Sequence, residues 1–301
     1  MRGVWTAIIT PFDQHGNLEL STFKALLKNQ KEAKATGVIT CGTTGEAATL
    51  SETEKKTLIQ IALEELEGSQ TKVMAGTGTN NTAETLELSK WAFQQGVHGL
   101  LLVTPYYNKP TQTGLEKHFL NIADKVNCEI MLYNVPGRTA VSLTAETIIK
   151  LAGHPNITSL KEASGNLAFL SEIKNQLILA NKKLDLLSGD DALFLPSLAV
   201  GTTGVVSVAS NLFPRRMTAI QKAFEAGNHQ KAKELHQFYY PLFRDLFIET
   251  NPAPIKFALS YAGWCKNILR LPLVTISLTS QKKLIQSLKM CKIKSNARAA
   301  L

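Results

Sequence analysis

Eight short runs with strand-like patterning alternate with stretches of helical spacing along most of this 301-residue chain. The runs cover roughly residues 3–12, 37–46, 72–80, 99–108, 129–136, 157–164, 184–191 and 201–210. Sustained alternation of strands and helices predicts parallel strands joined by right-handed crossovers. Eight such units in about 225 residues favour a closed (β/α)8 barrel over an open doubly wound sheet.

After Phe213 the pattern becomes wholly helical, with three apolar-striped segments before the end of the chain. No low-complexity linker precedes them, so they are expected to pack on the barrel and not to move as an independent domain. The sequence therefore predicts a (β/α)8 catalytic barrel over residues 1–225 and a C-terminal helical extension over residues 226–301.

The net charge of +9 is concentrated at the C-terminus, where the last twenty residues supply six basic side chains and no acid: Lys282, Lys283, Lys289, Lys292, Lys294 and Arg298. No aromatic residues are interleaved with them, which favours a solvated helix face and frayed terminus over a nucleic-acid patch. The chain has no uncharged apolar run of 18 residues, so no membrane association is expected.

The four cysteines, Cys41, Cys128, Cys265 and Cys291, lie far apart and form no CxxC motif. A disulfide or zinc framework is therefore not expected, and the reducing cytoplasm is the predicted location. None of the six histidines forms a strand-borne HxH pair, so no catalytic metal is expected either.

In a barrel of this kind, chemistry gathers at the carboxyl ends of the strands. Hydroxyl and phenol groups dominate these ends, and the seventh ends in Asp190 and Asp191, which would repel a phosphate. The run "GTGTNN" from Gly76 lacks the third glycine of a dinucleotide fingerprint, so its glycines are interpreted as permitting a tight strand exit.

One lysine stands at a strand end, in the stretch "ITSLKEAS", where period-two alternation places Ser159 and Lys161 on the same face. Two interpretations are equally supported by spacing alone. Lys161 is either a structural ion-pair partner of Glu162 or Asp190, or a nucleophile that forms a Schiff base. A lysine amine attacks a ketone only when unprotonated, and desolvation in an apolar barrel favours the neutral form. Tyr133, one strand earlier, lies at a comparable height and could relay the proton.

Six motifs carry a resemblance to a known family: "GTTGE" at 42–46, "TPYYNKP" at 104–110, "YNVPGRT" at 133–139, "KEASGN" at 161–166, "LLSGDD" at 186–191 and "GVVSV" at 204–208. In this order and spacing they resemble the dihydrodipicolinate synthase family, within the superfamily of pyruvate-dependent class I aldolases and N-acetylneuraminate lyases. The resemblance implies a lyase that condenses pyruvate with L-aspartate-4-semialdehyde through a lysine Schiff base. This reaction belongs to the diaminopimelate route of lysine biosynthesis.

The resemblance also implies roles for individual residues. Lys161 would form the imine with pyruvate, with no separate cofactor, and Tyr133 would shuttle protons. Thr43 would bridge Tyr133 to Tyr107, and Tyr107 would reach into the site of a neighbouring subunit. The implied assembly is a homotetramer, built as a dimer of tight dimers. The substrate-binding positions implied by the motifs are Thr44, Val206 and Gly189 for pyruvate and Arg138 for the carboxylate of the semialdehyde.

Two alternatives remain at this point. An N-acetylneuraminate or 2-keto-3-deoxy-sugar-acid lyase shares the lysine and the tyrosine, but those relatives generally lack an arginine where "PGRT" places Arg138. A non-catalytic barrel that binds small keto acids is disfavoured by the presence of Lys161, Tyr133, Thr43 and Tyr107 together.

In lysine-sensitive members, the pathway product L-lysine binds in a cleft at the tight-dimer interface. The motifs place seven residues around that cleft: Ala47, Ala48, Glu52, Lys55, Asn80, Glu84 and Tyr106. Asn80, Glu84 and Tyr106 fit the sensitive pattern, whereas Glu52 and Lys55 stand where sensitive bacterial members commonly carry histidines. Glu52 would attract the ligand's ammonium or neutralise Lys55, but a protonated Lys55 would repel a cationic ligand.

We therefore predict weak or absent inhibition by L-lysine at millimolar concentration, because repulsion by Lys55 outweighs attraction by Glu52. Inhibition titrations of the wild type and of Lys55→His test this. Sensitivity gained only in the variant locates the cause at Lys55, whereas strong inhibition of the wild type contradicts the prediction.

Overall fold

The computed structural model describes residues 1–295, and its eight strands follow one another in chain order around a closed barrel. The pairings along it are parallel. Helices alternate with the strands, and further helices follow the last strand. The predicted (β/α)8 barrel with C-terminal helices is confirmed. Arg298 of the predicted basic tail lies outside the described residues.

The chain divides into two compact units. Unit 1 comprises Met1–Gly3 and Lys72–Val206, and unit 2 comprises Val4–Thr71 and the chain from Ser207 onward. The division expected from the sequence, into residues 1–225 and 226–301, stays a prediction.

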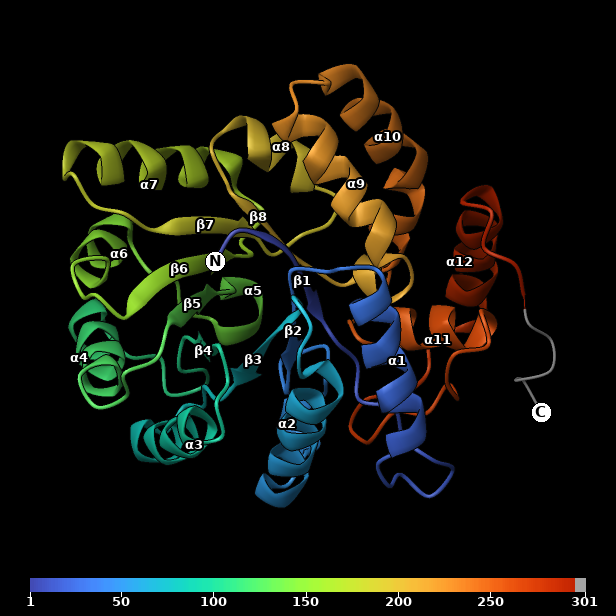
Figure 1. Ribbon diagram of the computed structural model, residues 1–301, viewed down its shortest axis with the longest axis horizontal. Coiled ribbons are helices and arrows are strands. Elements are labelled where there is room, and N and C mark those ends of the chain that lie inside the picture. Colours follow the sequence, from blue (N-terminus) through green and yellow to red (C-terminus); the bar gives the residue numbers. More distant parts are fainter. Residues whose placement is uncertain (296–301) are drawn as a thin grey trace. The chain divides into compact units, whose positions relative to one another are not determined.

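Unit 1 holds the alternating strands and helices from β3 to β8, and Figure 1 shows α3, α4, α6 and α7 lying outside its strands. The strands are β3 (Lys72–Gly76), β4 (Gly99–Val103), β5 (Ile130–Asn134), β6 (Ile157–Glu162), β7 (Asp185–Ser188) and β8 (Gly204–Ser207, of which Ser207 belongs to unit 2). The helices are α3 (Thr82–Gln94), α4 (Gln112–Ala123), α5 (Pro136–Thr139), α6 (Ala145–Leu151), α7 (Leu167–Leu179) and α8 (Phe194–Ala199). The strands are rich in apolar residues because parallel strands under a helical layer are buried on both faces.

Polar N-caps start the longer helices of unit 1 soon after the preceding strand. The capping side chains are Asn81, Thr111, Thr144 and Asn166, each of which accepts a hydrogen bond from a backbone N–H in the first turn of its helix. Such caps satisfy backbone donors that otherwise lack a partner. The strands of unit 1 end about two to five residues before the ends of the predicted runs, because the residues after each strand already belong to the turn or loop that leads to the next helix.

The pairing of β5 with β6 contains a one-residue irregularity that sets its register. Ile130 lies opposite Ile157, but Met131 lies opposite Ser159, so the extra residue on β6 is Thr158. Beyond this shift Tyr133 lies opposite Lys161, and Asn134 lies opposite Glu162. Without the extra residue, Tyr133 would face Leu160 and the lysine would align with the next position along β5.

Unit 2 contains the first two βα units and the C-terminal helices. Its elements are β1 (Gly3–Ala7, of which Gly3 belongs to unit 1), α1 (Leu20–Glu32), β2 (Gly37–Thr40), η1 (Ala47–Thr49), α2 (Glu52–Leu66), η2 (Ala209–Asn211), α9 (Pro214–Glu225), α10 (His229–Asp245), α11 (Ala253–Tyr261) and α12 (Leu278–Met290). Helix α10 packs against α9 and α12, and α12 also packs against α11. The chain beyond Phe213 therefore has the helical character expected from its sequence.

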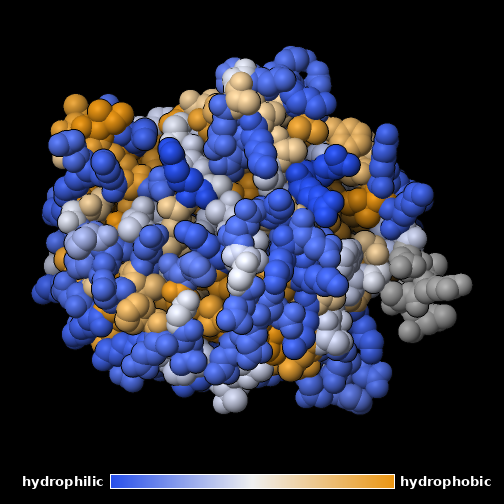
Figure 2. Space-filling model, viewed as in Figure 1, coloured by the Kyte–Doolittle hydropathy of each residue, from blue (hydrophilic) through white to orange (hydrophobic). Residues whose placement is uncertain are grey.

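The surface of unit 1 carries a small apolar patch over one end of α7, at the upper left of Figure 2. Its members are Ile178, 67% exposed, and Leu179, 78% exposed. Two adjacent side chains are too small a patch to indicate an interaction surface by themselves. Within residues 1–295, no helix combines the length and the apolar character needed to cross a membrane.

The exit of β3 depends on a glycine, as the interpretation of "GTGTNN" predicts. A Cβ atom on Gly78 would lie 2.6 Å from the backbone nitrogen of Val103 and 3.0 Å from Leu102 Cα. We expect Gly78→Ala to lower the free energy of unfolding by about 1–3 kcal/mol, because strand backbone cannot move aside as a side chain can. Urea denaturation measures the loss.

Gly137→Ala is the matched control, since a Cβ atom there would meet nothing within 4 Å. It should differ from the wild type by less than about 0.5 kcal/mol. Equal losses in the two variants would show that close packing at Gly78 is not the cause.

Candidate active site

Lys161 and Tyr133 form the buried centre of the candidate site in unit 1. Their strands put them opposite each other, and the Lys161 Nζ atom lies 3.9 Å from the centroid of the Tyr133 ring. The two residues are only 6% and 5% exposed, respectively. A lysine ammonium within about 6 Å of the centroid of an aromatic ring is attracted to its face. The arrangement holds the Lys161 amino group beside a phenol and away from bulk water.

The acidic residues proposed as structural partners of Lys161 engage other groups. Glu162 accepts a hydrogen bond from Asn134 Nδ2 at 2.7 Å and another from the backbone N–H of Ser164 at 2.5 Å. Asp190 accepts from the backbone N–H of Ala192 at 2.8 Å. Among the described residues of unit 1, no ion pair joins Lys161 to either acid. This favours the interpretation of Lys161 as a nucleophile.

Asn134 ties the end of β5 to the chain that follows it. Its side-chain oxygen accepts a hydrogen bond from the backbone N–H of Leu143 at 2.9 Å, while its amide donates to Glu162. The short helix α5 lies between Asn134 and Leu143 and carries Arg138, whose side chain is exposed. The segment with Arg138 is thus anchored to the same strand ends that carry Tyr133 and Lys161.

The other predicted site residues of unit 1 are Val206, Gly189 and Tyr107, which lie near or after the ends of strands. Val206 is 1% exposed near the end of β8. Gly189 follows β7 and donates its backbone N–H to the Glu162 carbonyl at 2.7 Å, and a Cβ atom there would lie 2.5 Å from Ala163 Cβ. Tyr107, in contrast, is 89% exposed and has a φ of 73°. In a single chain it therefore stands in solvent, unlike the buried Tyr133.

Thr43 and Thr44 belong to unit 2, in the loop between β2 and α2. We call residues 41–50 the threonine loop. Its tight turns are closed by hydrogen bonds from Gly45 N to the Gly42 carbonyl at 3.1 Å and from Glu46 N to the Thr43 carbonyl at 3.0 Å. The Thr44 hydroxyl is buried and accepts a hydrogen bond from Asn251 Nδ2 at 3.0 Å.

The seven candidates for a lysine-binding cleft divide between the units: Ala47, Ala48, Glu52 and Lys55 lie in unit 2, and Asn80, Glu84 and Tyr106 lie in unit 1. Glu52 forms its ion pair with Lys56 at 2.6 Å, and this contact lowers the pKa of Glu52. The structure thus gives Glu52 a different ion-pair partner from the Lys55 considered in the sequence. In unit 1, Glu84 accepts a hydrogen bond from Asn81 at 3.1 Å.

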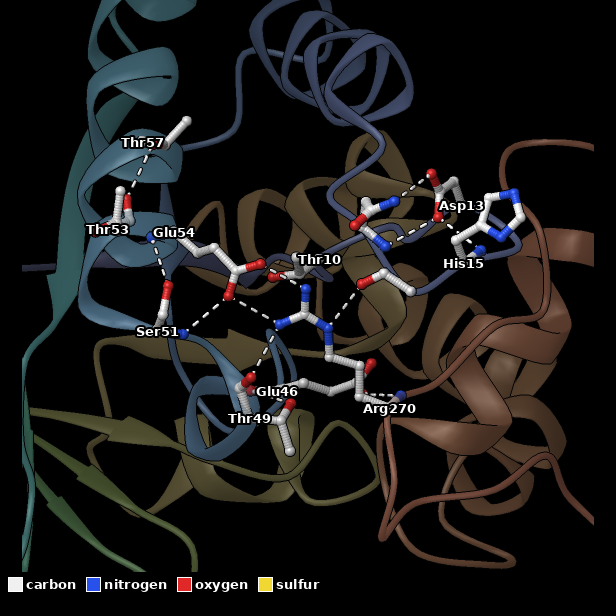
Figure 3. Close-up of polar contacts among 12 residues, drawn as sticks. Thr10, Asp13, His15, Glu46, Thr49, Ser51, Thr53, Glu54, Thr57 and Arg270 are labelled. Atoms are coloured by element: carbon white, nitrogen blue, oxygen red, sulfur yellow. Dashed lines mark hydrogen bonds and ion pairs between the residues drawn. The ribbon is translucent and has the colours of Figure 1, made fainter.

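Sequence reasoning missed a charged cluster that holds the threonine loop. Glu46 pairs with Lys256, and Arg270 contacts both Glu46 and Glu54, as Figure 3 shows for Arg270. The available signal was a lysine inside the otherwise apolar stretch "PIKFALSYAG". A lone lysine in such a stretch indicates a buried partner, but spacing along the chain does not name it.

The family is decided by comparison with known proteins. The model of the dihydrodipicolinate synthetase family matches residues 1–291 of the chain. The chain belongs to this family.

A 4-hydroxy-tetrahydrodipicolinate synthase from Leptospira biflexa is 46% identical over 276 residues, which cover 92% of each protein. The crystal structure of dihydrodipicolinate synthase from Aquifex aeolicus superimposes with a TM-score of 0.94 at 38% identity, covering 98% of this chain and 100% of that one. The pyruvate complex of the chloride-inhibited enzyme from Acinetobacter baumannii gives a TM-score of 0.93 at 36% identity, covering 97% of this chain and 99% of that one.

These findings confirm the prediction of a dihydrodipicolinate synthase family enzyme, a lyase of lysine biosynthesis. They do not test individual residues, whose roles in this family member stay predictions.

The ion pair between Arg270 and Glu54 makes the stability of unit 2 depend on pH. Hydrogen bonding to Arg270 lowers the pKa of the Glu54 carboxyl from 4.5 to about 2. A carboxylate with a depressed pKa stabilises the fold above its unfolded value and loses that contribution as pH falls through the folded value. The contribution is therefore complete above about pH 4.5 and declines toward pH 2.

We expect Glu54→Gln to be less stable than the wild type at pH 7, with a deficit that shrinks progressively below about pH 4.5. The glutamine retains the capping interaction with Ser51, so the change isolates the charge. Urea denaturation at a series of pH values measures the deficit. Glu146→Gln, which breaks an exposed pair with Lys150, should cost no more than about 0.5 kcal/mol at any pH. A Glu54→Gln deficit that does not change with pH would contradict the assignment.

Proposed function

We propose that the chain condenses pyruvate with L-aspartate-4-semialdehyde through an imine between pyruvate and Lys161, without a separate cofactor. The observation that carries this proposal is the buried Lys161 amine beside the ring of Tyr133 on the neighbouring strand. The pyruvate complex of the Acinetobacter baumannii relative supports pyruvate as the first substrate.

The proposed chemistry begins with addition of the Lys161 amine to the ketone carbon of pyruvate. As the new C–N bond forms, the C=O π bond breaks; Tyr133 gives a proton to the ketone oxygen and receives one from the amine nitrogen, and loss of water from this carbinolamine then yields the imine. Removal of a proton from the pyruvate methyl group gives an enamine, whose carbon attacks the aldehyde of the second substrate. The amino group of that substrate can then displace Lys161 from the imine carbon, which closes a ring and frees the lysine.

We assign the pyruvate carboxylate to the Thr44 hydroxyl, with the backbone near Gly189 and Val206 completing its pocket. Arg138 would bind the carboxylate of the semialdehyde, because its planar guanidinium matches a carboxylate in bidentate fashion. Thr43 and Tyr107 would extend the proton relay from Tyr133.

We propose a homotetramer built from tight dimers as the working assembly. In support, Tyr107 is 89% exposed in the single chain although its proposed role is in a relay with the buried Tyr133. If Tyr107 entered the site of a neighbouring subunit, it could take part in that relay although it is exposed in the single chain. We further propose a cytoplasmic location, supported by the free thiols of all four cysteines.

Borohydride trapping tests the covalent step. Reduction in the presence of pyruvate should leave a stable adduct on Lys161 and abolish activity, because borohydride converts the imine into a secondary amine. Peptide mass spectrometry locates the adduct. Lys256 provides an internal control, since it is also buried but is paired with Glu46. An adduct at Lys256 or another lysine, or none at all, would overturn the proposal.

The variant Arg138→Ala distinguishes use of the semialdehyde from adduct formation with pyruvate. The variant should still form the pyruvate adduct, while kcat/KM for the semialdehyde falls by at least about tenfold, since hydrogen bonds to charged groups are worth about 1.5–3 kcal/mol. Equal damage to adduct formation and to semialdehyde use would indicate a structural role for Arg138.

A further inference from the structure

A fully buried ion pair links the threonine loop to the C-terminal helices within unit 2. The side chains of Glu46 and Lys256 are both 0% exposed, and their charged ends are in direct contact. Lys256 also donates to the Ile268 carbonyl at 2.8 Å and lies 4.1 Å from the centroid of the Phe12 ring. Glu46 belongs to the loop that carries Thr43 and Thr44, whereas Lys256 belongs to α11.

Arg270 holds the same loop from a second side. Its backbone N–H donates to the second carboxylate oxygen of Glu46 at 3.1 Å, and its guanidinium donates to the Thr49 carbonyl at 2.9 Å. Another guanidinium N–H donates to the Gly16 carbonyl at 2.8 Å. Both ends of the 3₁₀ turn η1 are therefore tied to the chain between α11 and α12.

A third contact reaches Thr44 itself. The Asn251 side-chain amide donates to the Thr44 hydroxyl at 3.0 Å, and both residues are buried. A hydroxyl that accepts from an amide directs its own hydrogen elsewhere, because donor and acceptor directions on the oxygen differ. The contact therefore orients Thr44 as a hydrogen-bond donor, which is what an anionic carboxylate requires.

Stability alone does not account for these contacts. Desolvation of a buried ion pair consumes most of its attraction, so such a pair gives little net stabilisation compared with apolar residues of the same size. The loop it holds is also strained, since Cys41 and Glu46 both have a φ of 54° without being glycine. A strained loop held by costly buried charges is typical of a functional site.

We propose that Asn251 and the Glu46–Lys256 pair are positioning residues for pyruvate: they hold the threonine loop so that the Thr44 hydroxyl points at the pyruvate carboxylate. The inference rests on the proposed function, because Thr44 binds pyruvate only in that proposal. It makes the C-terminal helices part of the substrate-binding machinery.

A double-mutant cycle on the Glu46–Lys256 pair separates its effect on pyruvate binding from its effect on stability. Lys256→Met and Glu46→Gln each leave one buried charge without its partner, so both singles should be destabilised. The double variant removes both charges and should recover most of the stability. Its half-saturating pyruvate concentration, measured by borohydride trapping on Lys161, should stay raised by about tenfold, while KM for the semialdehyde changes by less than about twofold. A double variant with the pyruvate dependence of the wild type overturns the role of the pair.

A second double-mutant cycle tests whether Asn251 acts on pyruvate binding through Thr44. Asn251→Ala should raise the half-saturating pyruvate concentration by about tenfold in the wild-type background and by less than about twofold in a Thr44→Val background. Equal effects in both backgrounds would mean that Asn251 acts independently of Thr44, and would overturn its role. This cycle decides the question for Asn251 even if the charge variants do not fold.

Ser287→Ala is the matched control in the same helices. It removes a buried hydrogen bond of 2.6 Å to Asp245, between α12 and α10. It should lower stability and leave the pyruvate dependence unchanged, and a raised pyruvate requirement would show that any destabilisation of these helices disturbs binding. Failure of the wild type to form an adduct on Lys161 would instead overturn the proposed function. The two failures are therefore distinguishable.

Discussion

The register between β5 and β6 is the constraint on which the candidate site depends. Side chains on a strand alternate between its two faces, so a slip of one residue would exchange the faces of Ser159 and Lys161 with that of Leu160. The extra residue Thr158 sets the alignment at the amino-terminal side of the pair, three positions before Lys161. Every later feature follows from it: the amine lies against the Tyr133 ring, and Asn134 faces the acid that it binds. A local irregularity in backbone pairing thus determines which two side chains meet.

Two lysines among residues 1–295, Lys161 and Lys256, are buried, and their electrostatic surroundings differ. Lys256 contacts the Glu46 carboxylate, and burial nevertheless lowers its pKa because desolvation outweighs that attraction. Lys161 lies against an aromatic face, and its neighbours Glu162 and Asp190 are engaged by amide and backbone donors. The Glu46 carboxylate thus ties Lys256 to the threonine loop, whereas no ion pair joins Lys161 to an acid among the described residues of unit 1. The difference in partners agrees with the loop-holding role proposed for Lys256 and the imine-forming role proposed for Lys161.

The fold could be predicted from the sequence because periodicity is a local property. All eight strands were expected in the correct order, and the errors lie at their ends, where the polar turn before Asn166, for example, extends the apparent run past Glu162. The sequence predicts only approximately that Lys161 and Tyr133 lie opposite each other, because the extra residue Thr158 leaves no signal in the sequence. The Glu46–Lys256 pair could not be predicted, because its partners lie far apart along the chain and become neighbours only in the folded unit. The predicted roles of the site residues rest on the family motifs and not on periodicity.

Positive φ angles also have local causes at some positions and depend on tertiary contacts at others. Lys34 and Asn181 adopt a positive φ just beyond α1 and α7, where left-handed residues commonly end helices. Cys41, Glu46 and Tyr107 adopt it in loops that follow strands, where a helix C-terminus does not account for it. These loops keep their conformation only if surrounding contacts determine it, as the contacts of Glu46 do in unit 2. At Tyr107, which is exposed in the single chain, the turn is closed by a hydrogen bond from the Asn108 backbone N–H to the Tyr106 carbonyl at 2.9 Å, and the Asn108 side chain donates to the Asn80 carbonyl at 2.9 Å. The chain thus closes the turn at Tyr107 by itself, and it is the exposure of the tyrosine side chain that supports the proposed neighbouring subunit.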